Sequence, residues 1–172
     1  MHYLDPFTSV ILPALVLVLG GLGLPGAAVY INRNALRSKA WQSGVAAAGP
    51  LMNLAVLLVV SLLLHVLNMQ NSALGAALSM FAFLQASAVI FNLLPIPGFD
   101  GFAVIEPYLP IELRIAAMKA APMLMLGFIA LVMLIPAFSQ VIITSALKLA
   151  VLAGINPYEA IEGIRAFRFW KQ

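Results

Sequence analysis

Long stretches without a charged side chain are the feature that most limits how this chain can fold. Three such stretches, residues 6–32, 40–99 and 120–147, contain no Asp, Glu, Lys or Arg. Each is longer than the roughly 20 helical residues that cross a bilayer core of about 30 Å. Backbone groups in lipid must be hydrogen-bonded within the chain, so we predict an all-α integral membrane protein.

The composition agrees with a membrane solvent. Of the 172 residues, 63% are hydrophobic and 9% are charged, whereas soluble domains carry about a quarter charged residues. The basic residues cluster beside apolar segments, so we interpret them as topology signals and expect membrane lipid, not nucleic acid, as the partner. The chain has no cysteine, which excludes disulfides and zinc-thiolate sites.

Proline and glycine divide a membrane domain, predicted over residues 1–155, into four to five membrane-embedded helices, one or two of them broken. The predicted segments are about 8–31, 45–66, 73–94 and 120–136, followed by a helix over 138–153. Gln140, Thr144 and Lys148 place a polar stripe on that last helix, which either spans the bilayer or lies at its surface. Residues 156–172 are predicted to form a short polar tail, and its side of the membrane stays open.

Basic residues predict the orientation. Arg33, Arg37 and Lys39 precede the second segment, and Arg114 and Lys119 precede the fourth. The positive-inside rule places both groups on the cytoplasmic side. The opening residues lack a basic region ahead of an apolar core, so they do not form a signal peptide, and they do not resemble a natural beginning.

Asp100 is the strongest candidate for chemistry. It is the one acid between Ala40 and Ile105, and it follows Pro95 and Pro97, which end a membrane segment. A carboxylate flanked by apolar sequence costs free energy unless a cation, a metal or hydrogen-bond donors pair with it. We therefore predict a metal ligand or a proton-handling acid; the alternative is an Asp-Gly turn that caps the next helix.

Two amides, Asn53 and Asn92, also lie within apolar sequence. We expect them to bond across helices or to backbone freed by prolines, either as packing contacts or as site residues. Gly49 and Pro50 are expected to begin the second membrane helix, because proline suits a first helical turn.

The remaining titratable residues have simpler interpretations. His65 is predicted to lie at the membrane interface and His2 to have a structural role or none, while Glu106 and Glu112 are predicted to lie in a solvated loop. A His-Glu-x-x-His helix would supply two imidazoles and a general base for zinc, but the chain contains no such motif. This chain alone cannot complete that kind of site.

Two segments resemble signature segments of the bacterial site-2-protease-like intramembrane zinc metalloproteases. They are residues 48–53, AGPLMN, and residues 91–101, FNLLPIPGFDG. The segments HYLDP at residues 2–6 and GLPGAAVY at residues 23–30 are similar to the same family. The resemblance covers most of the chain to about Pro110 and implies the carboxyl-terminal part of such an enzyme.

The resemblance implies a role for each matching residue. Asp100 matches the carboxylate zinc ligand, and Asn53 and Asn92 match amides that order the site or receive the substrate backbone. The residues implied to support the site are Gly49, Pro50, Pro95, Pro97, Gly98 and Gly101. The implied activity is zinc-dependent hydrolysis of peptide bonds in transmembrane protein substrates, in the bacterial cytoplasmic membrane.

The zinc histidines and general-base glutamate of that family lie on a helix N-terminal to everything in this sequence. We therefore expect a fragment that is inactive by itself. The alternative is a non-catalytic scaffold or pseudoprotease that binds transmembrane helices, which predicts a natural start at Met1 and no zinc. A transporter subunit is less favoured, because the broken segments do not correspond in two halves. The substrate, the cleavage site and the oligomeric state stay open.

Overall fold

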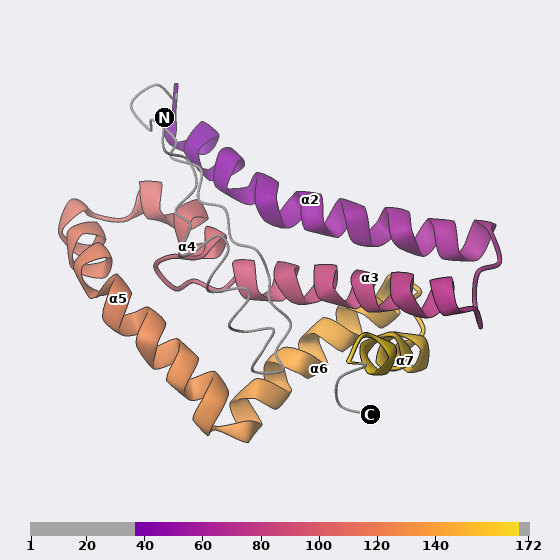
Figure 1. Ribbon diagram of the computed structural model, residues 1–172. Coiled ribbons are helices and arrows are strands. Elements are labelled where there is room, and N and C mark those ends of the chain that lie inside the picture. The colour runs from indigo at the N-terminus through magenta and orange to yellow at the C-terminus, as the bar shows by residue number, and fades with distance from the viewer. Residues whose placement is uncertain (1–36, 169–172) are drawn as a thin grey trace, which may run out of the picture. The chain divides into compact units, whose positions relative to one another are not determined.

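The computed structural model describes residues 37–168, and every regular element in that range is helical (Figure 1). The predicted all-α fold is confirmed. The elements in chain order are α2 (Lys39–Val66), α3 (Ala73–Asn92), α4 (Asp100–Ile105), the 3-10 helix η3 (Glu106–Tyr108), α5 (Ile111–Leu134), α6 (Pro136–Leu152) and α7 (Pro157–Phe167). The predicted segment over residues 8–31 and the candidate His2 lie outside the described residues.

α2 and α3 form an antiparallel hairpin (Figure 1). The side chain of Ser38 caps α2 by accepting a hydrogen bond from a backbone N–H three residues ahead at 3.3 Å. Ser72 caps α3 in the same way at 2.9 Å, as N-terminal serines commonly do. Between the helices, Asn68 and Asn71 have φ angles of 49° and 61°, a conformation that asparagine tolerates better than most residues. The uncharged turn between the two segments is therefore built from caps and left-handed asparagines.

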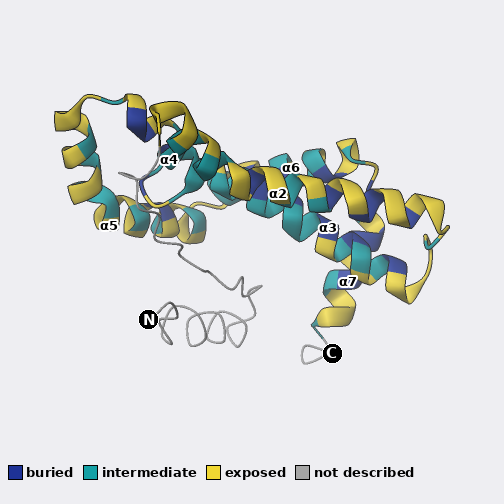
Figure 2. Ribbon diagram, turned by 90° about the horizontal axis from the view of Figure 1, so that it is seen from above, coloured by how far each residue is buried: buried dark blue, intermediate teal, exposed yellow. Residues whose placement is uncertain are grey.

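The core of the described chain lies where α2, α3 and α6 meet. Its buried members are Leu57, Val60 and Leu64 of α2, Ala82 and Ala86 of α3, Ala150 of α6, and Ile155 after it. Small alanine side chains on α3 and α6 let neighbouring backbones approach closely, as membrane helix packing requires. Exposed positions nevertheless alternate with buried ones along α2 and α3 (Figure 2).

Three described helices, α2, α3 and α5, are long and apolar enough to cross a membrane, with mean hydropathies of 2.2, 1.9 and 2.0. α6 and α7 pass the same test only as a pair bent by 119°. The most apolar part of α5 is 6% buried within the protein, against 28% for α2. Most side chains of α5, many of them large and apolar, are exposed, as expected of a helix that faces lipid.

Both boundaries of α5 differ from the sequence prediction, and prolines explain both. α5 begins at Ile111, directly after Pro110, instead of near Ala120. The connection that carries Glu112 is therefore already helical. α5 then ends at Leu134, because the extended residue before Pro136 cannot continue a helix.

The predicted polar tail contains α7, which packs on α3. Its buried residues are Glu159, Ala160 and Gly163. A Cβ atom added at Gly163 would collide with the carbonyl oxygen of Ala76, which means that the two backbones are in direct contact. The tail is thus partly a packed element of the membrane domain.

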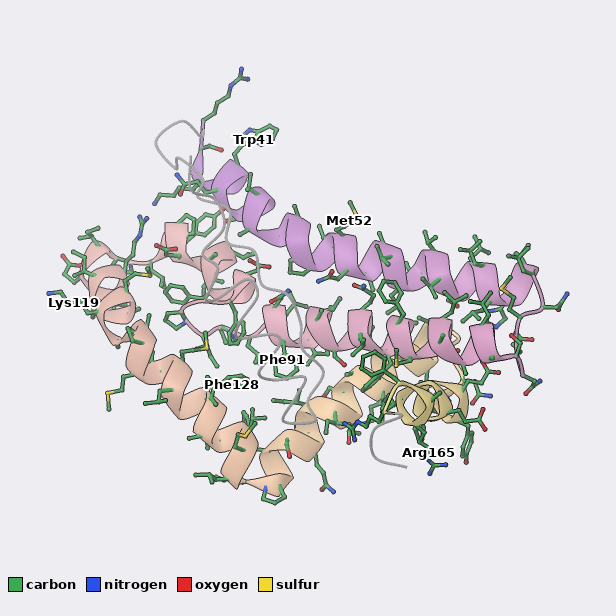
Figure 3. The ribbon with its side chains drawn as sticks, viewed as in Figure 1. Trp41, Met52, Phe91, Lys119, Phe128 and Arg165 are labelled. Atoms are coloured by element: carbon green, nitrogen blue, oxygen red, sulfur yellow. The ribbon has the colours of Figure 1, made fainter. Side chains whose placement is uncertain are left out.

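Aromatic rings join α3, α5 and α6. Phe128 of α5 has edge-on contacts with Phe91, Phe99 and Phe138, with ring centroids 6.1, 5.3 and 6.0 Å away. Phe91 and Phe128 extend toward each other between α3 and α5 (Figure 3). Edge-on packing is the favoured geometry for aromatic pairs, so this cluster holds α5 beside the segment that leads to Asp100.

Candidate metal site

Asp100 is the first residue of α4, and its side chain lies against Gly49 of α2. A Cβ atom added at Gly49 would lie 2.8 Å from Oδ2 of Asp100. Residues about 50 positions apart in the sequence thus meet between two helices. The carboxylate is half-buried, and it has no hydrogen bond or ion pair to any other residue in the range 37–168. Burial raises the pKa of the Asp100 carboxyl above its ordinary value.

The turn before Asp100 is built by a proline and a glycine. The N–H of Phe99 donates a hydrogen bond to the carbonyl of Ile96 at 3.0 Å. Pro97 and Gly98 occupy the two central positions of this turn, and Gly98 has a φ angle of 108°. This residue order is typical of type II turns, in which the second central residue requires positive φ. The turn reverses the chain after α3 and directs it back toward α2.

Gly101 lets the start of α4 approach the end of α3. A Cβ atom at Gly101 would collide with the carbonyl of Leu93 and would lie 2.7 Å from the carbonyl oxygen of Leu94. The N-cap position of α4 is Phe99, and no side-chain cap is present there. Asp100 is therefore not the helix cap of the alternative interpretation, and its carboxylate is available for another partner.

The prediction that Gly49 and Pro50 begin the second membrane helix is wrong. They lie inside the helix, which begins at Lys39. An interior proline removes one backbone hydrogen bond and leaves the carbonyl one turn earlier without its helical donor. Asn53 lies one helical turn after Gly49, so both residues are on the same face of α2 and the amide leans back toward Gly49. This arrangement brings Asn53 to the side of α2 that Asp100 faces.

Asn92 is the last residue of α3, and Pro95 lies in the loop that follows. Asn53 and Asn92 are both half-buried. Neither amide has a hydrogen bond to another residue of the described chain, so the expected bonds to neighbouring helices do not form there. The amides therefore have donor and acceptor capacity for a ligand.

Residues 37–168 contain no group of three or more His, Cys, Asp or Glu side chains that could hold a metal ion. A catalytic zinc usually takes three protein ligands and a water. The donor chemistry of Asp100 fits such an ion, because it is a half-buried carboxylate that no described residue neutralises. The described part of the chain can supply one ligand and would need others to hold the metal.

Two buried carboxylates were missed by sequence reasoning. Glu106, expected in a solvated loop, is 2% exposed and forms an ion pair with Arg114, with Oε1 and Nε 2.6 Å apart. Glu159, expected in a polar tail, is 5% exposed. The position of Arg114 eight residues after Glu106 was a signal in the sequence for this ion pair. No local pattern points to the burial of Glu159.

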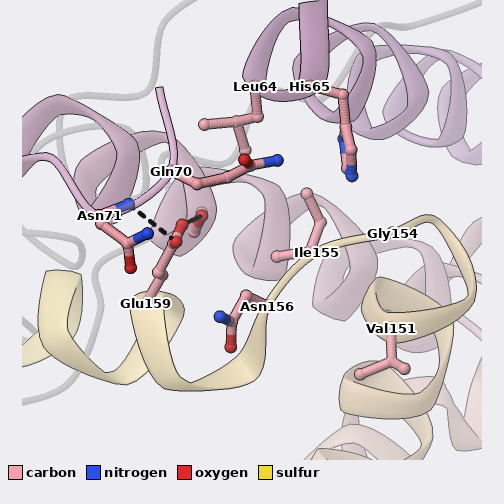
Figure 4. Close-up of a pocket in the computed structure, with 10 residues that line it drawn as sticks. Leu64, His65, Gln70, Asn71, Val151, Gly154, Ile155, Asn156 and Glu159 are labelled. Carbon is pink, nitrogen blue, oxygen red and sulfur yellow. Dashed lines mark hydrogen bonds between the residues drawn. The ribbon is translucent and has the colours of Figure 1, made fainter. Parts of the chain in front are cut away.

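Glu159 joins α7 to the hairpin at the end opposite Asp100. Its Oε1 accepts a hydrogen bond from the N–H of Asn71 at 3.1 Å, and its Oε2 accepts one from Oγ of Ser79 at 3.0 Å (Figure 4). Glu159 and the exposed His65 both line a cavity of about 420 Å³. Both oxygens of the carboxylate are engaged, so this cluster is a structural joint between helices.

Comparison with known proteins yields relatives in the mycobacteria. No family model matches the chain, and no solved structure does. The chain is 36% identical over 170 residues to the "Putative zinc metalloprotease Rip2" of Mycobacterium tuberculosis (strain ATCC 25618 / H37Rv), which covers 98% of this chain and 65% of the relative. The protein of the same name from Mycolicibacterium smegmatis is 32% identical over 173 residues, which covers 99% of this chain and 65% of that relative. The chain thus spans slightly less than two thirds of the length of these relatives.

Proposed function

We propose that this chain, which is similar over nearly its whole length to relatives named as zinc metalloproteases, forms the carboxyl-terminal part of a site-2-type intramembrane protease. Asp100 would be one ligand of the catalytic zinc. The other ligands would come from the part of the longer protein that this chain does not include. The proposal gives the chain a place in a bacterial cytoplasmic membrane, with transmembrane proteins as substrates.

The half-buried carboxylate of Asp100, which has no partner among residues 37–168, is the observation that carries this proposal. Sequence and packing both hold it there. Two prolines end the preceding membrane segment, Gly49 lacks the Cβ atom that would meet the carboxylate, and Gly101 lets α4 approach the end of α3. A partly desolvated carboxylate without a partner is costly. A bound zinc would compensate this charge and would polarise a peptide carbonyl and activate a water molecule.

The amides beside Asp100 fit a substrate that is itself a polypeptide. Asn53 faces the same side of α2 as Gly49, and Asn92 ends the helix that leads into the Asp100 loop. Each amide offers both a donor and an acceptor, which is what an unpaired peptide backbone needs inside a membrane. In this proposal the two amides bind the substrate chain, while the loop over residues 93–99 keeps Asp100 at a fixed depth.

Zinc binding by the full-length protein tests the proposal directly. We expect the protein purified from its own membrane to contain one zinc per chain by elemental analysis, and Asp100→Ala to lose it or to bind it at least 10-fold more weakly. The matched control is Glu112→Ala, which removes an exposed carboxylate from the first turn of α5 and should retain the metal.

Two results would contradict the proposal. Zinc content that Asp100→Ala leaves unchanged would exclude this carboxylate as a ligand. A natural full-length protein without zinc would favour the other candidate function, a non-catalytic scaffold that binds transmembrane helices beside α2 and α4.

A further inference from the structure

α4 is too short to fix its own direction. It has six residues, whereas isolated helices below about 12 residues are marginal in water. Its direction, and with it the position of Asp100, must therefore depend on contacts at its two ends. At the first end, Gly101 packs on the carbonyls that close α3, and Asp100 lies over Gly49.

The other end of α4 is held by two polar contacts. Oγ of Ser43, near the start of α2, donates a hydrogen bond to the carbonyl of Val104 at 2.6 Å. Directly after α4, the side chain of Glu106 is 3% exposed and pairs with Nε of Arg114 at 2.6 Å. This ion pair connects the end of α4 to the first turn of α5. Arg114 is thus one of the groups that fix the orientation of this deeply buried carboxylate.

We infer that Glu106, held by Arg114, is a positioning residue for the Asp100 carboxylate, an inference that rests on the proposed function. The two acids are six residues apart on nearly continuous helical backbone, which is about 9 Å along the axis at 1.5 Å per residue. Over so short a distance a helix moves as a rigid rod. A displacement at Glu106 is therefore transmitted to Asp100, although Glu106 itself does not contact the metal.

A double-mutant cycle on zinc affinity tests the inference in the full-length protein, by competition with a chelator of known affinity. Glu106→Gln and Arg114→Lys should each weaken zinc binding about 10-fold or more, the size typical of residues that orient a metal ligand. Arg114→Lys keeps the positive charge but loses the planar guanidinium group. Its zinc affinity can therefore be measured even if Glu106→Gln does not fold. Because Glu106 acts through Asp100, the double variant Asp100→Ala/Glu106→Gln should bind zinc no more weakly than Asp100→Ala alone.

Glu159→Gln is the matched control, since it alters a carboxylate of similar burial at the opposite end of the hairpin. It should lower the melting temperature and leave zinc affinity unchanged. The inference is overturned if Glu106→Gln changes zinc affinity no more than Glu159→Gln does, or if its effect adds fully to that of Asp100→Ala. If Asp100→Ala itself has no effect on zinc affinity, it is the proposed function that fails.

Discussion

Oδ2 of Asp100 occupies the space where a side chain on Gly49 would begin, 2.8 Å from the position of the missing Cβ. A carboxylate on one short helix therefore depends on the absence of a single carbon atom on another. This relationship joins the two sequence segments that carry the family resemblance, and it makes the position of Asp100 open to direct test.

Gly49→Ala should displace Asp100 without unfolding the protein. The new methyl group meets a carboxylate, while alanine favours a helix by about 0.5–1 kcal/mol over glycine. We expect zinc affinity to fall about 10-fold or more with little loss of thermal stability. Gly44→Ala is the control on the same helix, because a Cβ atom there has no neighbour within 4 Å. Equal zinc affinities in the two variants would contradict the contact.

Asp100→Asn should stabilise the zinc-free protein at neutral pH. Burial raises the pKa of this carboxyl in the folded state, so the ionised form is less stable in the folded chain than in the unfolded one. The advantage of asparagine is complete above the folded-state pKa and disappears as the pH falls below the ordinary aspartate pKa of about 3.9. Melting temperatures in detergent with a chelator, at pH 7 and about pH 3, check this. A melting temperature lower than that of the unmodified protein at pH 7 would show that the carboxylate is stabilising.

Gly163→Ala should loosen α7 from α3. The added Cβ would meet the backbone of Ala76 and would lie 2.7 Å from Cβ of Met80, and backbone cannot move aside as a flexible side chain can. Overpacking of this kind costs about 1–3 kcal/mol, visible as a lower melting temperature. Gly127→Ala of α5, where nothing lies within 4 Å, should leave it unchanged or slightly higher. Similar melting temperatures for both variants would argue against the close packing of α7.

Ser79→Ala should destabilise the protein more than Ser87→Ala on the same helix. Ser79 is fully buried and donates to the Glu159 carboxylate, a charged bond worth about 1.5–3 kcal/mol. The hydroxyl of Ser87 donates to the carbonyl of Phe83 at 2.8 Å, a local bond that contributes little. Thermal unfolding of both variants measures the difference, and equal losses would mean that the Glu159 joint is weak.

The features predicted correctly from the sequence depend on local patterns. Charge-free stretches long enough to cross a bilayer were enough to predict an all-α membrane protein. The residues 48–53 and 91–101 indicated a resemblance that agrees with relatives named as zinc metalloproteases. The role of Asp100 as a ligand stays a prediction. A proline can begin a helix or lie within one, and the sequence around Gly49 and Pro50 does not distinguish these cases because the preceding residues are themselves helix-compatible.

The features that were missed depend on contacts between distant residues. Glu159 accepts hydrogen bonds from Ser79 and Asn71, which lie 80 and 88 positions earlier in the chain. No local pattern contains that information. Glu106 looked solvated because prolines and charges surround it, but it is 2% exposed and pairs with Arg114 of α5. Burial of an acid follows from tertiary structure, which spacing along the chain reveals only when both partners are near.

α5 has few buried contacts with the rest of the described chain. Phe128 is its one buried residue, and the ion pair of Arg114 ties its first turn. Most of its other side chains are exposed. Hydrophobic mismatch acts on a helix through its exposed length, so a thinner or thicker bilayer would tilt α5 about Phe128 while the α2–α3 hairpin keeps its shape.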